Sequence, residues 1–210
     1  MVSLRRGGME GMTTHSGARQ DRIVVRQREG CRAQVTYQTS ENCRNGENYQ
    51  ISENGVWRME RISEGWLGQG GVGKTKEGDG KTPSGRLSFL YAFGTCPSPG
   101  TVFPYRRLDN SHELVDDAGS QYYNQIVSRR DVVPDWRSAE HMTAMGRAYR
   151  YGLVTDYNRG RIPGLGSGIF LHCEEGRPTA GCVAVPQEMM CWLLKNMSAD
   201  CYMVIDFPGG

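Results

Sequence analysis

The sequence contains no long apolar run. None of its hydrophobic segments approaches the roughly 20 residues that a helix needs to cross a bilayer, so we expect no integral membrane segment. The first residues, MVSLRRGGMEGMTTHSGARQ, begin basic but lack the apolar stretch of about 7 to 15 residues found in a signal peptide. Residues 1–20 are therefore predicted to be a disordered leader, a mis-set start or a truncated secretion signal, and residues 21–210 a single domain.

The chain also lacks a strong excess of either charge. It has 25 Lys and Arg against 23 Asp and Glu, a net charge of +2, with no run of five like charges. Binding to nucleic acid or to an anionic membrane would ordinarily require a basic patch or run. The sequence therefore predicts no nucleic-acid partner, and it leaves the oligomeric state open.

No Cys-x-x-Cys pair occurs, so the ligand spacing of a structural zinc site is missing, and we predict no metal and no cofactor. Because no signal peptide is recognisable, we expect mostly free thiols. If one cysteine is reactive, the other six could still pair in fifteen ways. The seven cysteines are Cys31, Cys43, Cys96, Cys173, Cys182, Cys191 and Cys201.

Short apolar runs separated by Gly, Pro, Asn and Asp make up most of the chain after residue 20, and their length and pattern are typical of strands. These runs predict a mainly β fold. The clearest helix is expected in PQEMMCWLLKNM, with Pro186 in its first turn, and a second, shorter one over Ser138 to Met145. The expected strands are RIVVRQ, AQVTYQT, GVWRMERI, RLSFLYAF, YNQIVS, YRYGLVTDY, GIFLHC and YMVID.

The segment Gly68-Gln-Gly-Gly-Val-Gly-Lys-Thr75 matches the pattern G-x-x-x-x-G-K-[ST] of a phosphate-binding loop. That pattern needs a helix directly after it, whose N-terminal amides hold the phosphate. Here the next residues, Lys76 to Gly85, contain three glycines and a proline, which exclude a regular helix. Nucleotide binding therefore stays a minor alternative.

A histidine and a cysteine occur at the ends of two neighbouring apolar segments. His172 ends Gly168-Ile-Phe-Leu-His172, and after nine intervening residues Cys182 opens a second short strand candidate, Cys182-Val-Ala-Val185. A loop that turns back would bring the thiol near the imidazole. The thiolate is the nucleophilic form of cysteine, and a neighbouring imidazolium favours it.

The loop between them has residue types that suit acyl transfer. Gly181 permits close approach of a substrate, and successive amides there could bind an oxyanion. Thr179 adds a hydroxyl, and Arg177 could meet a substrate carboxylate. A buried cysteine is more often inert packing, so the residues by themselves leave catalysis and packing equally open.

The amino-acid sequence of these segments resembles the catalytic motif of the L,D-transpeptidase (YkuD-type) family. The segment ending in His172 is followed by Gly-Arg-Pro-Thr-Ala-Gly-Cys182, similar to the family's histidine, loop and Ser/Thr-x-Gly-Cys. Glu77-Gly-Asp-Gly-Lys-Thr-Pro-Ser-Gly85 resembles its EGD-x-x-TP-x-G hairpin. Three further segments, Tyr122 to Val127, Asp135 to His141 and Tyr151 to Asn158, resemble one branch of the family, and the likeness runs from about Trp66 to Asp206.

The resemblance implies a β-sandwich of mixed sheets, a peptidoglycan stem peptide as substrate, and a location outside the cytoplasmic membrane, facing the cell wall. It implies that Cys182 attacks the carbonyl of the third stem residue, that His172 takes the thiol proton, and that the amides of Gly181 and Cys182 bind the oxyanion, supported by Thr179. It further assigns substrate binding to three residues, Arg177, Tyr123 and Asn124. Transfer to an amine would cross-link the wall, and transfer to water would be L,D-carboxypeptidase activity.

Two positions depart from the family pattern. Many members have His before the Gly-Cys pair and Arg two residues after the cysteine, where this chain has Ala180 and Ala184. The nine-residue spacing is also shorter than in many members. A wall-binding module that keeps the fold without turnover is therefore an alternative from another functional class.

Overall fold

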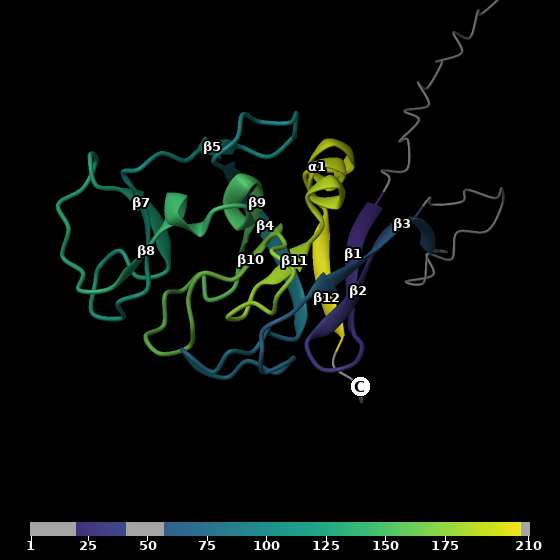
Figure 1. The fold of residues 1–210 in the computed structure, drawn as a ribbon, viewed down its shortest axis with the longest axis horizontal. Helices are drawn as coiled ribbons and strands as arrows, with labels where there is room; N and C mark the ends of the chain where they lie inside the picture. Colours follow the sequence, from purple (N-terminus) through teal and green to yellow (C-terminus); the bar gives the residue numbers. More distant parts are fainter. Residues whose placement is uncertain (1–19, 41–56, 207–210) are drawn as a thin grey trace, which may run out of the picture.

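A computed structural model describes residues 20–40 and 57–206 (Figure 1). Within them it has twelve strands, one α-helix and two short 3-10 helices, which confirms the prediction of a mainly β fold. The leader predicted over residues 1–20 lies, except for Gln20, outside the described residues, as does Cys43.

Nine strands form the large sheet, and this sheet closes on itself. The β12 strand pairs in parallel with β1 and antiparallel with β4, so the two sides of the sheet meet in a barrel. The sandwich expected from the resemblance is not confirmed. The strand order is β12 (Tyr202–Asp206), β1 (Gln20–Gln27), β2 (Arg32–Ser40), β3 (Trp57–Trp66), β11 (Val183–Val185), β10 (Phe170–Cys173), β9 (Gly152–Thr155), β4 (Gly85–Gly94) and β5 (Tyr105–Arg107).

The closure depends on the length of β4. Its first half, Gly85 to Ser88, pairs with β12, and its second half, from Phe89 to Phe93, pairs with β9. A register shift between Phe89 and Tyr91 lies at the start of the second half, as expected where a strand bends to serve two neighbours.

Helix α1 (Gln187–Asn196) packs on the core that the barrel strands enclose, and it lies at the top of Figure 1. It begins directly after Pro186, which occupies the N-cap instead of the first turn, and this helix was predicted correctly. Its buried residues recur at helical spacing, so they form one apolar face that packs against the core. They are Met189, Met190, Leu193 and Leu194.

A second, three-stranded sheet lies beside the barrel, on the left of Figure 1. Its order is β7 (Gln125–Ser128), β6 (His112–Val115) and β8 (Ala139–His141). The helix predicted over Ser138 to Met145 is therefore wrong in its first half, where the backbone pairs with β6. Only Met142–Met145 is helical, as a 3-10 turn that ends at Gly146, and a second such turn follows at Ala148–Arg150.

A separate apolar cluster joins the small sheet to the barrel. It draws Leu114 and Ile126 from the small sheet, Phe93 and Phe170 from the barrel, and it includes Cys182. The fold therefore places the candidate nucleophile at the junction of the two sheets. No helix in the described part of the chain is long and apolar enough to cross a membrane.

Candidate active site

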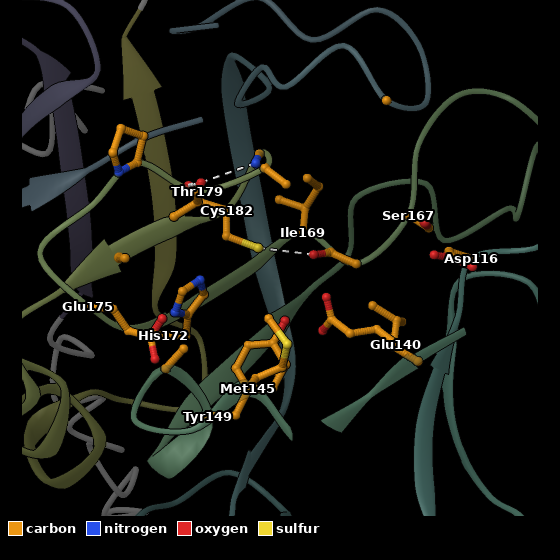
Figure 2. Close-up of a pocket in the computed structure, with 18 of the residues that line it drawn as sticks. Asp116, Glu140, Met145, Tyr149, Ser167, Ile169, His172, Glu175, Thr179 and Cys182 are labelled. Carbon is orange, nitrogen blue, oxygen red and sulfur yellow. Dashed lines mark hydrogen bonds between the residues drawn. The ribbon is translucent and has the colours of Figure 1, made fainter. Parts of the chain in front are cut away.

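His172 and Cys182 are brought together by neighbouring parallel strands. His172 in β10 is in register with Ala184 in β11, and Cys182 lies two residues before Ala184. Since side chains alternate along a strand, Cys182 and Ala184 point to the same side of the sheet. His172 and Cys182 both line one cavity of about 370 Å³, where they are only 7% and 8% exposed (Figure 2).

Cys182 is the only described cysteine that lines this cavity. The other five described ones, Cys31, Cys96, Cys173, Cys191 and Cys201, are also free thiols. Cys173 lies in β10 beside His172, but its thiol donates to the carbonyl of Tyr151 at 3.5 Å, and burial raises its pKa to about 12. The cavity thus selects Cys182 from the six.

Thr179 ties the loop before Cys182 to the barrel. Its backbone exchanges two hydrogen bonds of 2.9 Å with the segment Leu67 to Gln69. Its hydroxyl donates to the carbonyl of Cys182 at 2.7 Å and accepts the amide of Gly181 at 3.1 Å. The Gly181 amide, expected to bind an oxyanion, is therefore already engaged by Thr179.

Gly181 is required here by close packing. A Cβ at this position would lie 3.0 Å from the carbonyl oxygen of Lys81 and 3.1 Å from Cδ1 of Ile169. Lys81 belongs to the hairpin that resembles the family's EGD segment, and Thr82 in the same hairpin donates to the carbonyl of Cys182 at 3.4 Å. The hairpin and the cysteine loop therefore support each other.

The phosphate-loop pattern lies directly before this hairpin and is bonded to it. Nζ of Lys74 lies 2.9 Å from Asp79, and both side chains are almost fully buried. Burial by itself would raise the pKa of Asp79, but hydrogen bonds from Lys74 and from the amides of Thr75, Lys76 and Lys81 hold it well below its usual range. Strand β4 follows instead of a helix, so the pattern lacks the helix N-terminus that a nucleotide loop needs.

Both catalytic candidates are neutral at rest. Burial raises the pKa of the Cys182 thiol to about 12, and the thiol donates to the carbonyl of Gly168 at 3.1 Å. Burial also lowers the pKa of His172 to about 4. Among the described residues no hydrogen bond joins the Cys182 thiol to the His172 ring. The expected thiolate and imidazolium pair is therefore absent from this state, because both groups are buried.

The tautomer of His172 is set by a backbone carbonyl. Nδ1 lies 2.8 Å from the carbonyl oxygen of Cys173, which can only accept, so Nδ1 carries the proton. In the neutral ring Nε2 is then free of a proton and can accept one. The ring of Tyr149 packs edge-on against the imidazole, with 5.4 Å between ring centroids, and restricts its orientation.

Of the three residues that the resemblance assigns to substrate binding, only Arg177 lines the cavity. Its guanidinium bonds Glu175 at 2.8 Å and is 72% exposed at the rim. Tyr123 and Asn124 are not brought to the cavity. The Tyr123 hydroxyl donates to Glu77 at 2.7 Å, and the side-chain oxygen of Asn124 accepts the amide of Gly168 at 2.9 Å. Asn124 thus fixes the residue whose carbonyl accepts the Cys182 thiol.

Several cavity residues were not singled out from the sequence, and among them are Asp116, Glu140 and Tyr149. Glu140 belongs to the segment Asp135 to His141, which resembles the family, but nothing in that segment marks a role for it. In Figure 2 the thiol and the imidazole lie on the left, Asp116 on the right, and Glu140 between them. No group of three or more metal-binding side chains occurs in the described ranges.

No protein-family model matches the chain, and no curated protein matches it. Membership of the L,D-transpeptidase family therefore remains a prediction carried by the motif segments.

Proposed function

We propose that this protein is a cysteine acyltransferase of the L,D-transpeptidase kind, acting on peptidoglycan stem peptides outside the cytoplasmic membrane. The observation that carries the proposal is the shared cavity of Cys182 and His172, with Cys182 the only described cysteine in it. The resemblance of the surrounding segments supplies the substrate class.

The neutral resting state defines the first step. Nε2 of His172 takes the proton from Sγ of Cys182 as sulfur attacks the carbonyl of the third stem residue. The protonated imidazole then gives this proton to the departing nitrogen of D-alanine, and a thioester remains on Cys182. We assign the oxyanion to the amide of Cys182, because the amide of Gly181 is engaged by Thr179.

The second step regenerates the thiol. An amine attacks the thioester carbonyl and loses a proton through His172 to the departing sulfur, which yields a cross-link. Water in place of the amine yields a trimmed tripeptide, so L,D-carboxypeptidase activity uses the same residues. Dimers formed from purified disaccharide tetrapeptide indicate transfer, whereas tripeptides alone indicate trimming.

A covalent adduct tests the nucleophile directly. After incubation with a carbapenem, intact-mass spectrometry is expected to show one acyl adduct on the wild type, mapped to the peptide containing Cys182 and missing in Cys182→Ala. Cys173→Ala is the matched control, since that thiol lies outside the cavity and its variant keeps the adduct. An unmodified wild type contradicts the proposal.

A second candidate, a non-catalytic wall-binding module, is favoured by one observation. The raised pKa of Cys182 and the lack of a hydrogen bond to His172 describe an inert thiol as well as a resting one. Binding of purified sacculi that is unchanged in Cys182→Ala, together with no carbapenem adduct, would identify the module.

A further inference from the structure

One wall of the cavity is the face of the small sheet. In the pairing of β6 with β8, Leu114 lies opposite Glu140. Asp116 follows Leu114 by two residues, so alternation places Leu114, Asp116 and Glu140 on the same face. All three line the cavity that contains Cys182.

Each of the two carboxylates on this face has one buried oxygen that receives no hydrogen bond from the described part of the chain. These oxygens are Oε1 of Glu140 and Oδ1 of Asp116. Burial, and then the charge of Asp116, raise the pKa of Glu140, with a hydrogen bond from Tyr149 offsetting part of the effect. Two neighbouring buried carboxylate oxygens without donors are unfavourable, so this arrangement calls for a cation from outside.

The cations that line the cavity are already paired. Lys74 lies 2.9 Å from Asp79, and Arg177 lies 2.8 Å from Glu175. Neither forms an ion pair with Glu140 or Asp116 in the described part of the chain. The cavity is therefore acidic on the wall that faces the thiol.

The opposite face of the same sheet shows the contrast. There Glu113 is 2% exposed and fully partnered: Arg129 lies at 2.8 Å, the indole nitrogen of Trp136 donates at 2.9 Å, and Nε2 of His141 lies at 3.4 Å. Glu113 pairs with His141, the residue next to Glu140, so the fold does supply partners to a buried carboxylate at the neighbouring position of the sheet. On the cavity face, Glu140 has a hydrogen bond from Tyr149 but no cation in the described ranges, and one oxygen each of Glu140 and Asp116 has no donor.

We propose that Asp116 and Glu140 form a subsite for a primary ammonium group of the substrate, held beside the carbonyl that Cys182 attacks. An ammonium group brings one positive charge and three N–H donors, which match two carboxylate oxygens lacking donors. This inference rests on the proposed function. The ammonium belongs either to the side chain of the donor's third residue or to the acceptor amine.

Binding without turnover tests the subsite. In full-length Cys182→Ala protein, calorimetry compares the tetrapeptide L-Ala-γ-D-Glu-L-Lys-D-Ala with the same peptide acetylated on the lysine side chain. The free amine is expected to bind about ten- to hundred-fold more tightly, the range of a charge-assisted hydrogen bond. Adding Glu140→Gln or Asp116→Asn reduces that preference to less than about threefold. Adding Glu188→Gln leaves it unchanged, since Glu188 is exposed on α1.

The outcomes separate the subsite from the proposed function. Equal affinity for the two peptides, or a preference that survives Glu140→Gln in protein with a native circular dichroism spectrum, overturns the subsite. A preference that is lost in Glu140→Gln while the wild type transfers no acyl group supports the subsite and contradicts the function. In active enzyme, a KM raised only for the donor assigns the ammonium to the donor, and a KM raised only for the amine assigns it to the acceptor.

Discussion

The resting state of Cys182 leads to a quantitative prediction about its reactivity. An ordinary thiol with a pKa of 9.0 is about one-tenth thiolate at pH 8, whereas a pKa of about 12 leaves about one part in ten thousand. Alkylation by iodoacetamide is therefore expected to be about a thousand-fold slower at Cys182 than at N-acetylcysteine in the same tube.

The slope with pH distinguishes ionisation from restricted access. Labelling is followed by peptide mass mapping between pH 7 and pH 10, with Cys182→Ala to identify the peptide. Poor access alone lowers the labelling rate at every pH, and the rate still reaches its plateau near the pKa of a free thiol. A pKa of about 12 instead gives a tenfold rise per pH unit across the whole range.

His172→Gln is the informative variant in this assay. The thiol is held at rest by the carbonyl of Gly168 and the amide of Phe170, so removing the imidazole is expected to leave the labelling rate within about twofold. The same variant is expected to lose carbapenem acylation, because Nε2 accepts the proton only during attack. A labelling rate that levels off between pH 6 and pH 8 in the wild type, and falls in His172→Gln, refutes a neutral resting pair.

Three further predictions concern stability. Thr179→Val removes the hydroxyl shared by Cys182 and Gly181 and is expected to lower the free energy of unfolding by about 1–3 kcal/mol in urea, with Thr179→Ser closer to the wild type; equal midpoints for all three contradict this. The pKa of His172 is lowered from 6.5 to about 4, so between these pH values only the unfolded state binds the proton. The free energy of unfolding is therefore expected to fall by about 3 kcal/mol as the pH drops from 6.5 to 4, and this loss is expected to be missing in His172→Gln. Parallel curves of unfolding free energy against pH for the two proteins would show that the pKa is ordinary. Because the pKa of Glu140 is raised, its ionised form costs stability above pH 4.5. Glu140→Gln is therefore expected to unfold at a higher temperature than the wild type at pH 8 and at the same temperature near pH 3; a lower melting temperature of the variant at pH 8 would contradict the raised pKa.

Local patterns predicted much of the architecture. The eight apolar runs all contain strands, and α1 follows Pro186 as the sequence indicates. The proximity of His172 and Cys182 could also be predicted from the sequence, because each lies at the end of a short apolar segment and the loop between them is short. These features depend on residues close in sequence.

The remaining features depend on distant pairing. The barrel closes because Tyr202 to Ile205 pair with Gly85 to Ser88, more than a hundred residues away, and no periodicity encodes that contact. Strands β5, β6 and β8 have only three or four residues, too few to show a period. The protonation states of Cys182 and His172 follow from burial, which for Cys182 comes from an apolar cluster drawn from both sheets, and the motif does not indicate it.

The most direct test of acyl transfer through Cys182 is muropeptide analysis with purified protein and disaccharide tetrapeptide. Chromatography and mass spectrometry are expected to show cross-linked dimers, or tripeptide with released D-alanine, from the wild type and neither from Cys182→Ala. Substrate left intact by the wild type, or equal product from Cys182→Ala, would contradict the account.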